Sequence, residues 1–288
     1  MKYNIRKNWS DSLGFMKKNP VVMMPFVIIA FLELLALEFI YFSSRIPLSY
    51  VANPIIRKFF GEPFIHYPGS LVVLPRLFYY KQIGIYIVFG AFLTAVAVNM
   101  FKNIKDGLPV KAKAMIRNTL KNYVSLLIYA VLISALVFVL RKSDTFVYSR
   151  VMKVVAQHTP QSWALLFSVC FTLFLFLTNI VMQTFLICTI PFIVIQKVSI
   201  LKALARSIML GLRNFFTIFA LIFLPFFIYL PVIFLKSFSA QIMDKTFPEI
   251  NVFITIMGII VTIFLDSFAI ICVSQFVIDK KVVAEKTA

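Results

Sequence analysis

Two carboxylates lie deep inside apolar runs of the sequence, where a charged group is costly and usually serves a function. Glu33 falls near the middle of the first such run, and Asp266 falls inside the last. Carboxylates in such positions can take up and release protons or bind cations while a solute crosses a membrane. Two amides, Asn179 and Gln183, are four residues apart in another run and therefore share a helix face. These four side chains are the candidate polar path of a small permease or of a lipid or solute transporter.

A structural role for the same side chains is the alternative. A protonated carboxyl group or an amide can hydrogen-bond to a neighbouring helix and hold a membrane bundle in register. No Lys or Arg lies inside the apolar runs to face Glu33 or Asp266, which argues against buried ion pairs. Both interpretations stay open on the sequence.

The sequence carries no recognisable catalytic motif. His66 and His158 are the only histidines, and they lie in different polar connectors without metal-ligand spacing. GxSxG, HExxH and phosphate-binding glycine loops are absent. Cys170, Cys188 and Cys272 all fall in apolar runs, where a cysteine acts as a small hydrophobe. We therefore expect no catalytic residue, metal or cofactor, although a serine or aspartate site assembled only in three dimensions stays open.

Cationic side chains recur along two short segments, 102–122 and 197–214, each of which precedes an apolar run. In each segment the cations share one helix face, and aliphatic residues share another. Such a helix suits the membrane surface, where the aliphatic face enters the acyl region and the cations meet lipid phosphates. The candidate lipid-headgroup contacts are Lys113, Arg117, Lys121, Lys202, Arg206 and Arg213.

The composition points to a membrane protein. The sequence is 61% hydrophobic and contains 33 phenylalanines, which excludes an ordinary soluble domain. Its formal net charge is +18, and a charge of this size suits either nucleic acid or anionic lipid. We favour anionic lipid and expect no nucleic-acid partner, because the cations flank apolar runs and form no separate basic domain.

Six apolar runs are long enough to cross a bilayer, which takes about 20 residues in a helix. We therefore predict an all-α membrane protein with a single integral membrane domain over residues 1–288. The predicted spans are 21–42, 82–101, 123–140, 163–190, 215–234 and 252–276. Lys and Arg are more numerous in the N-terminal segment, in every second connector and in the C-terminal tail than in the other connectors. This bias predicts that both termini are cytosolic.

Two details of these spans carry further expectations. The first run is long for the core of a signal peptide, so we expect an uncleaved span. In the connector over 43–81, the apolar pieces 54–60 and 71–80 are too short to cross and are expected at the membrane interface or over the bundle. Pro225 and Pro231 are expected to bend the fifth span.

A repeated corner motif suggests internal repetition. A basic residue followed by Asn19, Asn122 or Asn214 stands immediately before the first, third and fifth spans. The even-numbered spans also end on similar strings, which begin at Phe101, Phe192 and Phe276. Three parallel copies of a surface helix followed by a helix pair account for both observations, whereas chance is the alternative for so short a string. The asparagine is expected to cap the entering helix or to bridge the amides of the corner.

One stretch resembles a known family. Pro191, Ile195, Ser199, Ala203, Arg206-Ser207 and Asn214 resemble the pattern of the six-helix membrane domain that is fused to some bacterial glycerophosphodiester phosphodiesterases and also occurs in stand-alone bacterial inner-membrane proteins. The likeness covers about 40 residues. The acidic residue common near Gln196-Lys197 in that family is missing, and no part of the sequence resembles the soluble phosphodiesterase domain. The resemblance therefore implies a helical bacterial membrane protein and transfers no catalytic residue.

From these features we expect a non-enzymatic protein of the bacterial cytoplasmic membrane. The first hypothesis is a role in membrane or envelope organisation, through binding of anionic lipid or a partner at a basic cytosolic face. A membrane-protein partner or a second copy of the chain would fit that face. The alternative is a transporter that uses the four polar side chains within the spans.

Overall fold

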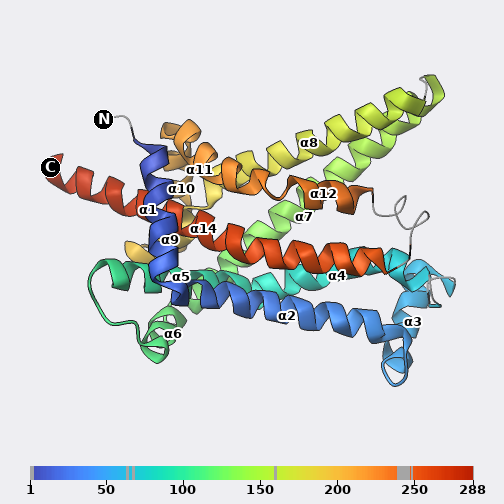
Figure 1. Ribbon diagram of the computed structural model, residues 1–288, viewed down its shortest axis with the longest axis horizontal. Coiled ribbons are helices and arrows are strands. Elements are labelled where there is room, and N and C mark those ends of the chain that lie inside the picture. Colours follow the sequence, from blue (N-terminus) through green and yellow to red (C-terminus); the bar gives the residue numbers. More distant parts are fainter. Residues whose placement is uncertain are drawn as a thin grey trace.

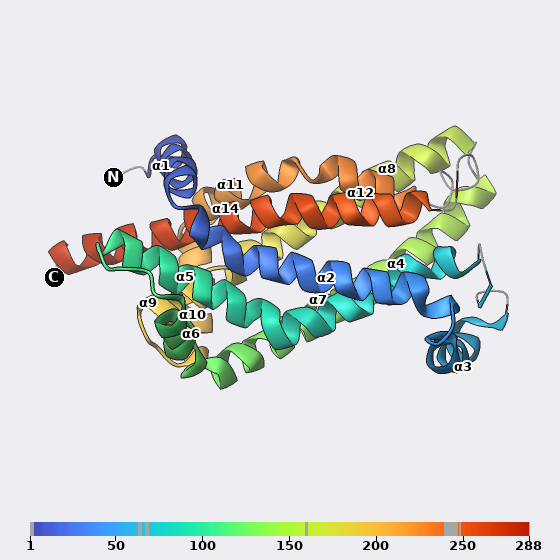
Figure 2. The ribbon, with the colours of Figure 1, turned by 60° about the horizontal axis from the view of Figure 1, so that its bottom comes forward.

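The computed structural model is a bundle of long helices that run side by side, with shorter helices at its two ends (Figures 1 and 2). The structure describes residues 3–62, 65–66, 69–158, 161–238, 247 and 249–287, and these residues form no strand. In chain order the elements are α1 (Ile5–Lys18), η1 (Pro20–Met23), α2 (Met24–Tyr41), η2 (Phe42–Ser44), α3 (Ser49–Phe60), α4 (Gly69–Ile85), η4 (Tyr86–Gly90), α5 (Ala91–Lys105), α6 (Ala112–Leu120), α7 (Tyr123–His158), α8 (Gln161–Leu186), α9 (Thr189–Ile195), α10 (Ile200–Arg213), α11 (Phe215–Phe227), α12 (Leu230–Ser237) and α14 (Ile250–Thr287).

Five of these stretches are long and apolar enough to cross a membrane, and a bent pair of helices raises the number to six. The single stretches are Pro20–Tyr41, Leu74–Lys105, Tyr123–Ser143, Leu166–Ile195 and Ile250–Lys280. The bent pair is α10 with α11, which meet at 94°. Large apolar side chains on these stretches point outward, among them Phe31, Phe39, Val124, Phe174 and Phe253. The all-helical class and the set of apolar spanning helices are therefore confirmed at this level.

The second apolar stretch corrects a prediction. Residues 71–80, expected at the interface because they are few, form part of α4, which continues through the π-helical η4 into α5. Pro75 does not end the helix, although proline leaves the carbonyl four residues earlier without its helical partner. That carbonyl, on Leu71, accepts a hydrogen bond of 3.5 Å from Asn251 Nδ2 on α14. The contact with α14 thus replaces the helical hydrogen bond that Pro75 removes, and the helix continues past a residue that usually interrupts one.

The fifth predicted span, 215–234, is divided into two helices. α11 ends at Phe227 and α12 begins at Leu230, so the chain breaks between Pro225 and Pro231. Ile228 and Tyr229 donate to carbonyls three residues earlier, at 3.1 and 2.9 Å. The bend predicted from the two prolines is present, and it takes the form of a tight turn between them.

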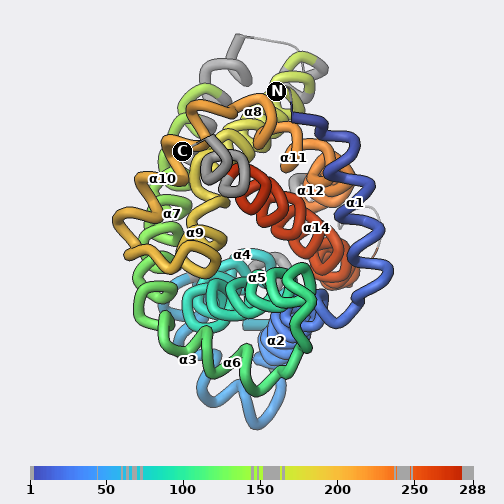
Figure 3. Tube along the Cα trace, turned by 90° about the vertical axis from the view of Figure 1, so that its left-hand side faces the viewer, coloured from blue at the N-terminus to red at the C-terminus, as the bar shows by residue number. Residues whose placement is uncertain are grey.

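Three short helices lie at one end of the bundle. α1, α6 and α10 occupy three different sides of that end, as the view along the bundle shows (Figure 3). The C-terminal part of α14 lies at the same end, whereas α3 lies at the opposite end (Figure 1). Each of the three short helices leads at once into a long or kinked apolar helix. This end therefore carries most of the cations singled out in the sequence.

Candidate functional site

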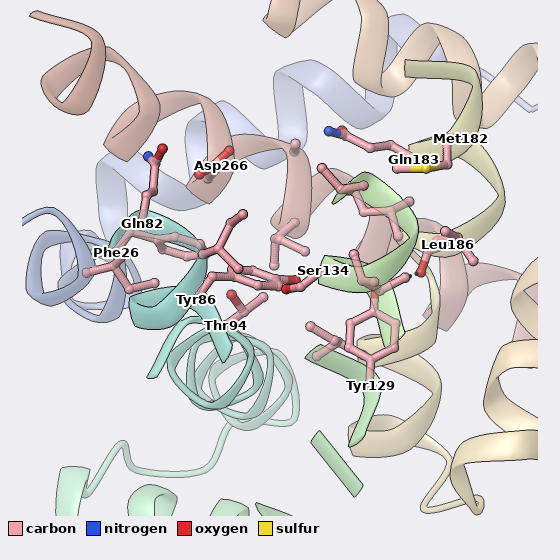
Figure 4. Close-up of a pocket in the computed structure, with 18 of the residues that line it drawn as sticks. Phe26, Gln82, Tyr86, Thr94, Tyr129, Ser134, Met182, Gln183, Leu186 and Asp266 are labelled. Atoms are coloured by element: carbon pink, nitrogen blue, oxygen red, sulfur yellow. Dashed lines mark hydrogen bonds between the residues drawn. The ribbon is translucent and has the colours of Figure 1, made fainter. Parts of the chain in front are cut away.

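A cavity of about 450 Å³ lies inside the bundle, between α2, α4, η4, α5, α7, α8 and α14. Glu33, Gln183 and Asp266 line it together, and Figure 4 shows Gln183 and Asp266 facing the same space from different helices. The structure thus brings together three of the four side chains proposed for a polar path, from the first, fourth and sixth predicted spans.

Asn179, the fourth member, does not line this cavity. It is exposed, and its Nδ2 donates to the Leu175 carbonyl of its own helix at 2.8 Å. Four residues along a helix turn a side chain by about 40° and move it by about 6 Å. That displacement separates the side chain of Asn179 from that of Gln183. Two residues that share a helix face therefore do not both reach the cavity.

Further polar side chains line the cavity that the sequence did not single out. They are Gln82, Tyr86, Thr94, Tyr129 and Ser134, all labelled in Figure 4. Gln82 Nε2 donates to Glu33 Oε1 at 2.9 Å. The Tyr129 hydroxyl donates to the Leu186 carbonyl at 3.2 Å. Tyrosine, threonine and serine are common in apolar helices, so the sequence gives no sign that these residues belong to a site. Only their meeting in three dimensions identifies them as lining residues.

A cation also acts on this group of carboxylates. Lys236, at the end of α12, is exposed and lies more than 4 Å from any carboxylate oxygen of Glu33, but its positive charge attracts a carboxylate at that position. Glu33 is 7% exposed, so its charge is only weakly screened by solvent. Lys236 comes two residues after the fifth predicted span, so the sequence prediction that no Lys or Arg within the spans pairs with these carboxylates is not contradicted.

The predicted lipid-headgroup contacts are all on the surface. Lys113, Arg117 and Lys121 on and after α6 are exposed, and so are Lys202, Arg206 and Arg213 on α10. Arg206 donates to Gln196 Oε1 at 2.7 Å. The aliphatic residues Leu201 and Leu212 on α10 are 74% and 66% exposed. An aliphatic side chain that the protein leaves this open faces either water or lipid.

The three short helices bury the same positions relative to the asparagine that follows each of them. The positions three and seven residues before it are buried in every case: Met16 and Ser12, Thr119 and Met115, Gly211 and Ser207. The position six residues before it carries an exposed aliphatic residue in every case: Leu13 at 37%, Ile116 at 43% and Ile208 at 38% exposed. All three helices thus present comparable faces to the bundle and to the surroundings.

A side-chain hydrogen bond from the buried face ties each short helix to a long one. On α1, Asn8 Nδ2 donates to the Cys272 carbonyl of α14 at 3.2 Å. On α6, Thr119 Oγ1 accepts from Asn99 Nδ2 of α5 at 2.7 Å. On α10, Ser207 Oγ donates to the Phe185 carbonyl of α8 at 2.7 Å. The supporting helices belong to the second, fourth and sixth predicted spans.

The corner asparagines act differently from the prediction. Asn19 and Asn214 cap the helix that ends, because each Nδ2 donates to the carbonyl four residues earlier, at 3.2 and 3.3 Å. Neither side chain caps the entering helix. Asn122 lies in the turn after α6, and its side chain makes no hydrogen bond to another described residue. In all three, the backbone carbonyl accepts the first hydrogen bond of the next helix.

We expect Asn214→Ala and Asn19→Ala each to destabilise the protein by about 1 kcal/mol, the usual net contribution of one hydrogen bond. Asn122→Ala is the matched control and should leave stability within about 0.5 kcal/mol of the parent. Unfolding of the purified full chain in detergent measures all three. An equal loss for the three variants would contradict the capping role.

The described residues contain no group of three or more His, Cys, Asp or Glu side chains that could hold a metal ion. The side chain of His158 lies outside the described residues. Comparisons of the chain with protein-family models, with curated proteins and with solved structures gave no match.

Proposed function

We propose that the chain consists of three parallel repeats, each a short surface helix followed by a pair of apolar helices. Support comes from the buried positions shared by α1, α6 and α10, and from the hydrogen bond that ties each to a long helix. α6 and α10 pack on the helix that precedes them in the chain, and α1 packs on α14, the last helix. The surface helix of the first repeat is thus supported by the last repeat, so each of the three surface helices packs on the end of an even-numbered predicted span.

The three surface helices serve, in this proposal, to engage anionic lipid on the cytosolic side of a bacterial inner membrane. The observation that carries it is a pattern of exposed side chains common to all three helices. An aliphatic residue is exposed six positions before the corner, and a cation is exposed directly before it: Lys18, Lys121 and Arg213. Aliphatic side chains enter the acyl region while cations pair with phosphates. Both termini would then be cytosolic, in agreement with the excess of Lys and Arg at this end.

Charge removal on α10 tests this function. We expect the triple variant Lys202→Gln, Arg206→Gln and Arg213→Gln to lose most of its preference for anionic lipid. A cation near an anionic surface contributes about 1 kcal/mol, so the preference should fall several-fold. Electron paramagnetic resonance measures it as the association of spin-labelled phosphatidylglycerol relative to phosphatidylcholine around the reconstituted full chain.

The matched control keeps the charge and changes the side chains, with Lys202→Arg, Arg206→Lys and Arg213→Lys. It should retain the preference for phosphatidylglycerol, and rising salt should weaken that preference in the control and in the parent. Equal lipid selectivity in the neutral triple variant and the parent, at low and high salt, would overturn the proposal.

A transport function is the second candidate, and the 450 Å³ cavity favours it. Glu33, Asp266 and Gln183 meet there with several hydroxyl groups at the level of the apolar spans. Carboxylates at such depth are typical of proton or cation pathways. Proton movement coupled to a solute in proteoliposomes, and its loss when Glu33 or Asp266 is neutralised, tests this function.

The family resemblance concerns the corner between a surface helix and the apolar helix that follows it. Of the residues that carry it, Pro191, Ile195, Ala203 and Ser207 are buried in α9 and α10, and Asn214 caps α10. These positions shape the corner between a surface helix and the next apolar helix. What the resemblance contributes to the proposal is therefore this architecture and a bacterial membrane, and no chemistry.

A further inference from the structure

A second cavity, of about 200 Å³, lies toward the end of the bundle away from α1, α6 and α10. α4, α7, α12 and α14 enclose it, and its polar lining is made by Tyr79, Gln82, Arg141, Lys236, Asn251 and Thr255. Small-molecule pockets usually measure about 300–1,000 Å³. This smaller cavity suits one charged group of a ligand, or a small ion, better than a whole drug-sized molecule.

Two cations converge on this cavity. Arg141 of α7 and Lys236 of α12 both line it, and their charges repel one another. The only hydrogen bond that Lys236 Nζ makes to a described residue is to the Tyr229 hydroxyl, at 3.2 Å. No described carboxylate lies within 4 Å of it. Glu33 attracts Lys236 from a distance, and Arg141 has a further interaction within the protein. Two positive charges on the lining of one small cavity still favour an anion between them.

Tyr79 contributes a neutral hydroxyl group and an aromatic ring to this cavity. The Tyr79 hydroxyl is buried and has no hydrogen-bond partner among the described residues, and a buried hydroxyl without a partner is costly. Arg141 lies over the ring of Tyr79, with its guanidinium carbon 3.7 Å from the ring centroid. This stacking fixes the planar guanidinium, whose fork of donors matches the oxygens of a phosphate or carboxylate.

We propose that this cavity binds an oxyanion, a phosphate or carboxylate group, between Arg141 and Lys236 with the Tyr79 hydroxyl as an additional donor. The group belongs either to a small free anion or to a lipid headgroup that enters from the side of the bundle. The site depends on neither proposed function, because it lies at the other end from the surface helices and contains neither Glu33 nor Asp266.

Gln82 links this site to the central cavity. It lines both cavities, and its amide donates to Glu33. Lys236, in turn, attracts Glu33. An oxyanion bound at Lys236 would weaken that attraction, so occupancy of the outer site would be felt by the carboxylates of the central cavity.

Binding of two probes tests the site and identifies the source of the anion. Inorganic phosphate represents a free anion, and dihexanoyl phosphatidate represents a lipid headgroup; each is titrated by calorimetry into the detergent-solubilised full chain. We expect at least one to bind, and Arg141→Gln or Lys236→Gln to weaken that binding by about tenfold or more, because each removes a charge-assisted hydrogen bond. Phosphate binding indicates a free anion, and binding of phosphatidate alone indicates a headgroup.

Lys142→Gln is the matched control, since Lys142 is the neighbour of Arg141 on α7, is exposed as Arg141 and Lys236 are, and does not line the cavity. This variant should bind within about twofold of the parent. The proposal is overturned when neither probe binds, or when all three variants bind the probe equally well.

Chemical protection gives a second readout that needs no variant. A membrane-impermeant acetylating reagent, applied to the parent in detergent, modifies exposed lysines, and mass spectrometry follows each site. The bound probe should slow acetylation of Lys236 several-fold and leave Lys142 unchanged. Equal rates at Lys236 with and without a saturating concentration of the probe would contradict the site even if the substituted chains fail to fold.

Discussion

Glu33→Gln and Asp266→Asn should each reduce solute-coupled proton movement to the level of protein-free liposomes. Both substitutions keep the size and polarity of the side chain but remove the group that takes up and releases a proton. Glutamine at position 33 can still accept the hydrogen bond from Gln82, so the bundle should stay folded. Full-chain proteoliposomes containing entrapped pyranine report proton entry when a solute from a panel of phosphates, carboxylates and amines is added outside.

Glu38→Gln is the matched control for this experiment. Glu38 lies on the same helix, α2, and is exposed instead of facing the cavity. Its neutralisation should leave proton movement unchanged. Should the parent move protons with none of these solutes, or should both cavity variants move them as fast as the parent, the transport function is wrong. Loss of thermal stability alone in the two variants would instead support the structural role of these carboxyl groups.

The features of the fold that can be predicted from the sequence are the local ones. Long apolar runs fix helices of spanning length because every backbone group must be satisfied within the helix. The corner at Asn214 could be placed because a cationic, amphipathic segment gives way there to an uncharged one, and α10 and α11 do meet at 94°. Pro225 and Pro231 likewise marked the break between α11 and α12. Each of these features depends on neighbours along the chain.

The cavities could not be predicted, because their linings come from helices far apart in the sequence. Glu33 and Gln82 meet across 49 residues, and Asn251 reaches the Leu71 carbonyl across 180. Lys236 lies just beyond an apolar run, so the composition assigns it to a connector. In the structure it ends α12, the short helix that follows the break after α11, and its charge acts on Glu33. The sequence also does not show which of the two helices at a corner the side chain of Asn214 caps, because either helix end could accept it.

Gly211→Leu should destabilise the protein by about 3 kcal/mol, because α10 packs on α8 too closely for a side chain there. A Cβ at this position would lie 2.9 Å from Phe185 Cδ1 and 3.1 Å from both the Phe185 Cα and the Thr184 carbonyl oxygen. A rotamer change moves only the first of these atoms, whereas the backbone of α8 must shift for the others. Overpacking of this kind costs about 1–3 kcal/mol, and the shift also stretches the hydrogen bond from Ser207 to Phe185. Thermal unfolding of the purified chain in detergent measures the loss.

Gly14→Leu is the control that separates packing from helix propensity. Gly14 lies in α1, and a Cβ there meets no atom within 4 Å. Leucine forms helices better than glycine by up to about 1 kcal/mol, so this variant should be as stable as the parent or slightly more so. Because Lys202, Arg206 and Arg213 are carried by α10, displacement of that helix should also lower the preference for anionic lipid, although no charge is removed. If Gly211→Leu matches Gly14→Leu in both stability and lipid preference, α10 does not rest on α8, and the lipid-binding surface is not held by the packing described above.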